Sequence, residues 1–122
     1  MATIVPTVVL LGKQDGSIKR ITWTPVTEND TCAPVALPEY ADKSLQVLGT
    51  FGSASVALQG SNDGGATYAA LNIPAGTALA ITAAGVKAVL ENTELVKPVV
   101  TGGTSQSLTI VMVARLSNTM RT

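Results

Sequence analysis

Residues 54–61 alternate between apolar and small or polar side chains, and the run ends at Asn62-Asp63-Gly64-Gly65. Successive side chains of a β-strand point to opposite faces, so this period of two predicts a strand with one buried face. The Asn-Asp-Gly-Gly run predicts a tight hairpin turn, because such turns need residues that tolerate a positive φ. Residues 67–71 are expected to return as the second strand.

β-branched residues and chain breakers extend this prediction to the rest of the chain. Thr and Val make up about a quarter of the 122 residues, which favours strands. Eleven Gly and six Pro residues interrupt the chain too often for long helices. About seven to nine short strands separated by such turns are typical of an all-β fold, a β-sandwich or jelly roll. Besides the hairpin, strands are expected at 7–11, 18–24, 44–51, 78–81, 95–100 and 107–116.

The length of the chain fits a single domain over residues 1–122. Within it we expect an N-terminal arm at 1–12 and a polar C-terminal tail at 117–122. Residues 7–11 are apolar throughout, so a strand there is expected to be covered on both sides.

Two segments leave alternatives open. Residues 25–43 contain three prolines and form the longest irregular stretch, so either a short strand lies at 35–37 or the segment is an interaction loop. Residues 82–90 could begin with one helical turn, because Val86, Val89 and Leu90 have helical spacing.

Prolines inside expected strands carry their own prediction. Pro25 and Pro98 cannot donate a backbone hydrogen bond. Each therefore predicts either the end of a strand or a place where the strand is an edge.

The charge pattern argues against nucleic acid as a partner. Eight basic and eight acidic residues give a formal net charge of zero, and they are scattered along the chain. Nucleic-acid binding draws much of its affinity from a basic surface, and the longest basic run here is Lys19-Arg20. The N-terminus lacks the basic start and apolar stretch of a signal peptide, and no apolar run approaches the ~18 residues of a membrane span. We expect no membrane partner and synthesis in the cytoplasm.

The residues available for catalysis are few. The chain has no His, which removes the commonest general base and the commonest metal ligand. Its single cysteine, Cys32, has no Cys or His partner nearby in the sequence and is expected to be a partly buried, inert thiol. Two carboxylate pairs, Glu39 with Asp42 and Glu91 with Glu94, are better explained as solvated surface charge. We therefore expect no enzyme activity, no catalytic, cofactor-binding or metal-binding residues, no cofactor and no small-molecule substrate.

Two other kinds of ligand site can be weighed from the residues. The Gly-rich stretches 49–52 and 101–104 lack the residues of a phosphate-binding loop and are expected to be turns. Asn62 and Asp63 alone supply too few oxygen ligands for calcium. Among the four aromatic residues, Trp23 is expected to lie in the core, and Tyr40 is the best candidate for an exposed ring that could stack on a sugar.

Two resemblances involve the second half of the chain. Residues 56–65, followed by Tyr68, resemble the hairpin of discoidin-type jelly rolls, which bind sugars or lipid head groups. The likeness covers about fifteen residues and is mainly a hairpin signature, so it concerns the fold more than a ligand. A broader set of motifs resembles small proteins encoded among the head and tail morphogenesis genes of tailed phages. Within the span from about residue 20 to 115, these motifs are 21–31, 41–52, 60–64, 82–85 and 97–103.

The second resemblance implies a virion component that decorates or cements the capsid at its outer surface. Its implied partners are the major capsid protein and copies of itself, as a homo-oligomer. The alternatives are another structural station of the phage, such as a head fibre, neck or tail protein, and a discoidin-like carbohydrate-binding module. No site residue is implied by either resemblance.

Overall fold

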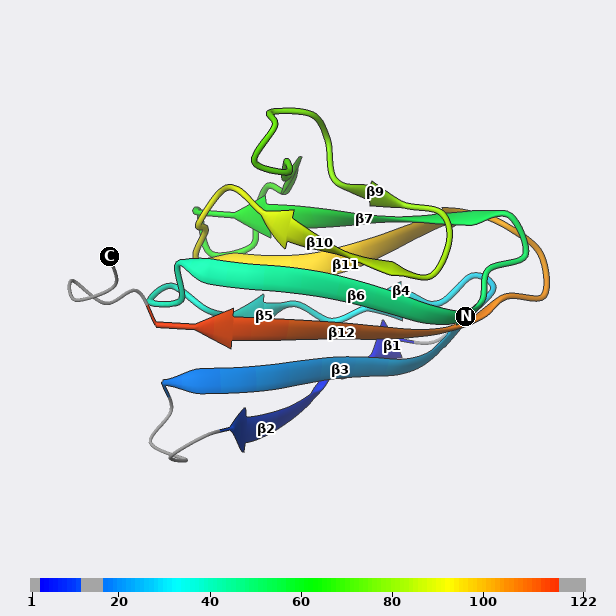
Figure 1. Ribbon diagram of the computed structural model, residues 1–122, viewed down its shortest axis with the longest axis horizontal. Coiled ribbons are helices and arrows are strands. Elements are labelled where there is room, and N and C mark those ends of the chain that lie inside the picture. The colour runs from blue at the N-terminus through cyan, green and yellow to red at the C-terminus, as the bar shows by residue number, and fades with distance from the viewer. Residues whose placement is uncertain (1–2, 12–16, 117–122) are drawn as a thin grey trace.

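The computed structural model describes residues 3–11 and 17–116, and those ranges contain strands and turns without a helix (Figure 1). The all-β prediction is confirmed. The described strands number twelve, more than the seven to nine predicted. Five of them have only two residues, and two of these, at Thr3–Ile4 and Thr31–Cys32, lie where no strand was predicted. The expected tail at 117–122 lies outside the described residues. The strands are β1 Thr3–Ile4, β2 Thr7–Leu11, β3 Ile18–Thr27, β4 Thr31–Cys32, β5 Val35–Ala36, β6 Asp42–Thr50, β7 Ala54–Ser61, β8 Ala69–Ala70, β9 Ala80–Ile81, β10 Gly85–Val89, β11 Leu95–Gly102 and β12 Ser107–Arg115.

Two antiparallel sheets form the sandwich. The first has the strand order β10-β6-β12-β3-β2, and the second has the order β5-β11-β7-β8, with β9 also pairing with β7. A short parallel pairing joins β1 to β4. The described part of the segment expected as an N-terminal arm is thus held in sheets, through β1 and through β2.

The core lies between the two sheets and confirms the predicted role of Trp23. Trp23 is fully buried on β3, and its indole Nε1 donates a hydrogen bond to the Ala33 carbonyl at 2.9 Å. Because the polar end of the ring is satisfied, the whole side chain can be buried without an unmatched donor. The largest side chains packed with it come from both sheets: Ile21, Leu45, Leu58, Leu108, Ile110 and Met112.

The predicted hairpin is present, but its loop is wider than the tight turn predicted at 62–65, because the last paired residues are Gly60 and Ala69. β7 pairs with β8, and the loop between them contains Gly64 at φ +75° and Gly65 at φ +95°. Asp63 stabilises this loop, since its Oδ1 accepts from Ser61 Oγ at 2.7 Å and from Thr67 N at 2.9 Å.

Both prolines inside strands lie where one edge of the strand is open. β2 pairs with β3 only as far as Thr22, so Pro25 has a partner strand on one side alone. Trp23 faces Ile110 and Val26 faces Leu108, which leaves Thr24 and Pro25 opposite the single residue Thr109 as a β-bulge. Likewise, β5 pairs only with Leu95 and Val96, so β11 has one neighbour at Pro98.

Both segments for which alternatives were left open, 25–43 and 82–90, contain strands. The short strand expected near 35–37 exists as β5, and 25–43 also contains the end of β3 and all of β4. Residues 85–89 form β10 along the edge of β6, which rules out a helical turn through those residues. Helical spacing of three apolar residues was misleading there, because Val86 is exposed and only Val89 reaches the core.

One prediction about burial is wrong. β2 was expected to be covered on both sides, yet Val8, Val9 and Leu10 are 46%, 39% and 40% exposed in the single chain. Figure 1 shows β2 at the margin of the molecule beyond β3. Apolar sequence on both faces predicted coverage, but coverage depends on whether a strand of the facing sheet reaches that far.

Candidate interaction surface

The side chains with potential for chemistry are separated in the fold. Cys32 is buried, and burial followed by the nearby charge of Asp30 raises its pKa to about 11, so the thiolate is disfavoured. Within residues 3–11 and 17–116 no cluster of three or more His, Cys, Asp or Glu side chains is placed to hold a metal ion. No helix able to span a bilayer occurs in the same ranges.

Two of the paired carboxylates bind backbone amides. Glu91 Oε1 accepts from Asn72 N at 2.7 Å and Oε2 accepts from Asn72 Nδ2 at 2.6 Å. These hydrogen bonds lower the pKa of Glu91 below its ordinary value. Glu94 Oε1 accepts from Gly64 N at 3.1 Å and so connects the β7–β8 loop to the start of β11. Both carboxylates therefore fasten loops, which is a more specific role than the solvated charge predicted for them.

The hairpin oxygens considered for calcium are also occupied within the chain. Asn62 Oδ1 accepts from Glu94 N at 3.0 Å, while Asp63 is bonded to Ser61 and Thr67. Hydrogen bonds from those two residues lower the pKa of Asp63. Their geometry is that of a braced turn.

The two Gly-rich stretches lie against each other at one end of the sandwich. The chain turns at 51–53 and again at 103–105, and Thr104 N donates to the Gly52 carbonyl at 3.0 Å. The prediction that these stretches are turns is confirmed, although Gly49 and Thr50 still belong to β6 and residues 101–102 to β11.

The prediction of an exposed Tyr40 is wrong. Tyr40 is only 6% exposed, and Lys19 Nζ lies 5.0 Å from the centre of its ring. Tyr68 is half-buried and has Lys97 Nζ 4.2 Å from its ring centre. Proline beside Tyr40 suggested a loop in solvent, but the cation that packs over the ring comes from a distant strand. Tyr40 is therefore closed to a sugar, and one face of the Tyr68 ring is occupied by a cation.

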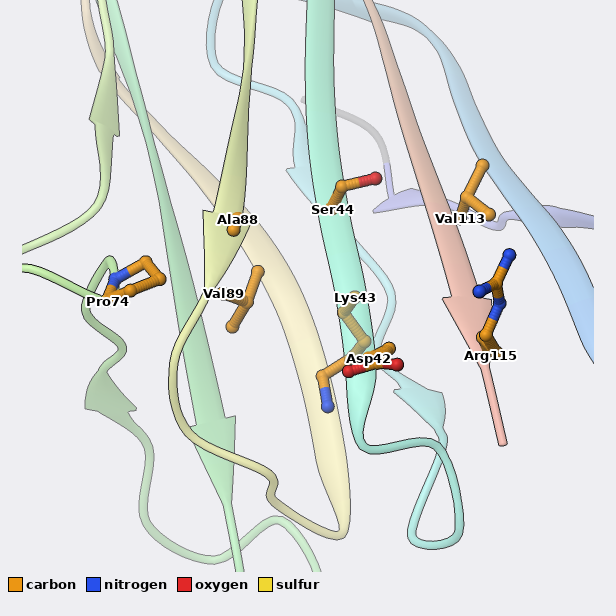
Figure 2. Close-up of a pocket in the computed structure, with 8 residues that line it drawn as sticks. All are labelled: Asp42, Lys43, Ser44, Pro74, Ala88, Val89, Val113 and Arg115. Atoms are coloured by element: carbon orange, nitrogen blue, oxygen red, sulfur yellow. The ribbon is translucent and has the colours of Figure 1, made fainter. Parts of the chain in front are cut away.

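An open groove of about 460 Å³ runs beside the ends of β6 and β10 (Figure 2). Lys43 lines it but is almost fully buried, and its Nζ donates to the Tyr40 carbonyl at 2.7 Å and to Asn92 Oδ1 at 2.9 Å. Burial lowers the pKa of Lys43. The ammonium group of Lys43 is therefore engaged in hydrogen bonds within the chain, at one end of the sandwich. The remaining lining residues are Asp42, Ser44, Pro74, Ala88, Val89, Val113 and Arg115.

The outer surface of the first sheet is the candidate interaction surface. We call it the outer face. It follows from the strand registers, because residues directly opposite each other in neighbouring strands point to the same side. One row across it runs Thr7, Thr22, Val111, Gln46 and Val86. The other members are Val9, Leu11, Ile18, Arg20, Thr24, Thr27, Ser107, Thr109, Val113, Arg115, Asp42, Ser44, Leu48, Thr50 and Ala88.

Charge is sparse on this outer face. Its strands carry only Arg20, Arg115 and Asp42 there, and Arg115 stands opposite Asp42 in the β6–β12 register. The lysines of the same strands point to the other side of the sheet: Lys19 packs over Tyr40, Lys43 is buried, and Lys87 Nζ donates to the Ala80 carbonyl at 3.0 Å. The uncharged positions are Val, Leu, Ile and Ala mixed with Thr, Ser and Gln, and Leu48 and Val86 are 40% and 59% exposed. Absence of lysine together with exposed aliphatic side chains is a feature of protein–protein interfaces.

Sequence reasoning found only part of this surface. Val111 and Val113 can be recognised from the sequence alone, because they alternate with the apolar core residues of β12 and are more apolar than solvent requires. Leu48 gave a similar but weaker signal on β6. The contribution of Val86 could not be found from spacing, since it depends on β10 pairing with β6.

Comparisons with known proteins agree with the fold. No family model matches the chain, and no curated protein matches it. Among solved structures it is similar to the SPBc2 prophage-derived protein YomS, with 10% identity and a TM-score of 0.58. The alignment covers 88% of this chain and 99% of that one. The chain therefore shares its β-sandwich fold with a protein encoded by a prophage.

Proposed function

We propose that this chain is a structural protein of a tailed-phage particle that binds the outside of the capsid shell without chemistry. The observation that carries the proposal is the outer face, where exposed Val, Leu and Ile side chains stand among Thr, Ser and Gln and from which the lysines are turned away. A sheet that needed only to face water would be expected to place polar residues at these positions.

The phage assignment has two supports of different kinds. The ordered motifs from Trp23 to Gly103 resemble phage morphogenesis proteins, and the fold is similar to that of a prophage-derived protein. Balanced charge favours the exterior of the shell over the interior of a packaged head, where DNA attracts basic surfaces.

The energetics of decoration are within reach of so small a protein. An interface of standard size, about 1,600 Å² in total, supports affinities from micromolar to picomolar. Contacts with several shell subunits at once would add avidity without any new chemistry. The proposal requires no cofactor, metal, nucleic acid or membrane.

The experiment that tests the location is the copy number per particle, measured by quantitative mass spectrometry on purified virions. Hundreds of copies are expected for a shell protein, as against on the order of ten for a ring at the neck, because icosahedral and ring symmetries differ in that way. A handful of copies would contradict the shell assignment and favour the neck or tail alternative.

The outer face is tested by substitution of Val111, which lies at its centre. Val111→Lys is expected to abolish binding to shells that lack the protein, because a buried interface centre tolerates an unpartnered charge poorly. Val99→Lys is the matched control, since Val99 is an equally half-buried valine on the second sheet. Tryptophan emission reports whether each variant folds, because Trp23 is fully buried. Equal loss of binding in both variants, with both folded, would contradict a role for this face.

The carbohydrate-binding alternative is less favoured by the described aromatics. Its best stacking candidate, Tyr40, lies in the interior under Lys19. Binding of immobilised glycans by the purified chain would revive that alternative.

A further inference from the structure

The edge of β2 is a strand edge without the protections that natural sheets use. It pairs with β3 through residues 7–11, and no other strand lies against it in the part of the chain that the structure describes. Thr7-Val8-Val9-Leu10-Leu11 contains no charge and no proline, and its pairing with β3 has no bulge. An exposed apolar edge of this kind presents a row of backbone donors and acceptors for another strand.

The other described strand edges are short, or carry a proline or a lysine. The open edge of β3 beyond Thr22 contains Pro25, and that of β11 beyond Val96 contains Lys97 and Pro98. On β10, the charged side chain of Lys87 reaches across to the Ala80 carbonyl of β9. β5 has two residues between Pro34 and Pro38, and β8 and β9 have two residues each. Since proteins usually blunt edges with lysine, proline or short strands, the bare edge of β2 stands out as a pairing site.

We propose that β2 pairs antiparallel with β2 of a second copy, about a two-fold axis that passes at Val9. In this register Val9 faces Val9 of the partner on the outer face. Val8 faces Leu10 of the other copy on the opposite side of the sheet, where Val8 already neighbours Ile21. The two first sheets then join into one continuous sheet.

A second copy fits this edge better than an unrelated strand. An isologous pairing covers both copies' exposed Val8, Val9 and Leu10 at once and leaves no further β2 edge open, so the assembly closes at two. Among the described residues, this pairing also brings no like charges close together. Arg20 lies one strand further in, so two Arg20 side chains would be separated by three strand spacings, roughly 14 Å. That separation exceeds the screening length of about 8 Å at physiological salt.

The small contact area limits the affinity expected for the dimer. Five residues on each strand cover far less than the roughly 800 Å² per partner of a standard interface. We therefore expect a reversible dimer that dissociates in the micromolar range or more weakly. The proposal depends on the edge alone and holds whether or not the chain binds a capsid.

Sedimentation equilibrium of the full chain over a range of concentrations tests the pairing. The native protein is expected to shift from monomer to dimer as concentration rises. Val9→Lys places two like charges opposite each other at the axis and is expected to weaken the dimer about tenfold or more. Val86→Lys is the matched control, because Val86 is an exposed valine on the far edge strand of the same sheet and should leave the dimer unchanged.

Cysteine cross-linking tests the register. Val9→Cys is expected to form a disulfide-linked dimer on mild oxidation, because residues directly opposite in an antiparallel pair lie about 4.5–5.5 Å apart. Val8→Cys and Leu10→Cys are expected to cross-link when mixed but poorly when alone, since like residues there are diagonal, roughly 7–8 Å apart. The native Cys32 should not compete, because it is buried and its pKa is raised to about 11.

Three results would overturn the proposal. One is a native chain that stays monomeric up to about 1 mM, well above the range expected for so small an interface. Another is a Val9→Cys protein that cross-links no better than Val86→Cys. The third is efficient cross-linking between Val9→Cys and Val86→Cys proteins, which would indicate an open chain of β2 edges paired with β10 edges.

Discussion

Three residues show how single positions carry the fold. Gly64 supplies a positive φ in the hairpin loop, Trp23 fills the centre of the core, and Glu91 fastens one loop through two hydrogen bonds. Each acts by a different physical effect, so each can be tested by a separate measurement.

Gly64 has φ +75°, and the space where a β-carbon would stand is open. Gly64→Val is therefore expected to lower the free energy of unfolding by roughly 1–3 kcal/mol through backbone strain alone. Denaturant unfolding measures the change. An unchanged midpoint would mean that the loop rearranges without cost.

Trp23 is fully buried, and its loss would leave a large cavity. Trp23→Ala is expected to destabilise the protein by about 3–5 kcal/mol. The native protein has a single Trp, so its emission should be blue-shifted relative to free tryptophan. Emission at the wavelength of the free amino acid would contradict the core position.

Glu91 links stability to pH. Hydrogen bonds from Asn72 N and Nδ2 lower its pKa in the folded state below the ordinary value of 4.5. Its contribution is therefore fully present above pH 4.5 and is lost as the pH falls through the folded pKa. Glu91→Gln is expected to reduce the difference in unfolding midpoint between pH 7 and pH 3. Asn72→Ala should reduce it partly, because the backbone donor remains. An identical acid dependence in the native protein and in Glu91→Gln would argue against this linkage.

At the scale of elements, the close approach of β12 to β6 depends on Gly49. Gly49 has φ +111°, and a β-carbon there would collide with the carbonyl oxygen of Ser107. Gly49→Ala is expected to cost roughly 1–3 kcal/mol or more, since strain and collision add. Gly64→Ala is the matched control, because it has the strain without the collision. Thermal unfolding compares the two variants, and equal losses would show that the collision is relieved by a small shift of β12.

Elements with a strong local pattern could be predicted from the sequence. The alternation at 54–61 and the turn at 62–65 appear in the structure as β7 and its loop. Two-residue strands such as β8 and β9 could not be bounded, because their pairing with β7 is decided by tertiary contacts.

Burial was predictable only where local pattern and tertiary contacts agree. Trp23 shares a strand face with Ile21, and both are buried. The burial predictions for Tyr40 and for β2 were wrong for opposite reasons. Tyr40 has polar neighbours in the sequence but is covered by Lys19, whereas β2 is apolar but no described strand covers its outer edge. The outer face needed the order of five strands, which no local pattern contains.

At the scale of the whole molecule, the two sheets differ in what surrounds them. The second sheet and the loops around it hold the fastened turns, including the hairpin and the Glu91 and Glu94 contacts. If both proposals hold, the first sheet binds a shell through the outer face and a second copy through the β2 edge. A pair joined at β2 would place two outer faces on one continuous surface, and two such faces binding together gain avidity.

The last prediction concerns the particle. If this chain clamps shell subunits from outside, particles made without it are expected to assemble but to release their DNA at a lower temperature than native particles. The reason is that packaged DNA presses outward, and each added contact between neighbouring subunits raises the free energy needed to separate them. A dye that fluoresces on released DNA measures the transition. Purified native protein and Val99→Lys should restore it, whereas Val111→Lys should not. Particles that release DNA at the same temperature with and without the chain would contradict a cementing role and leave decoration alone.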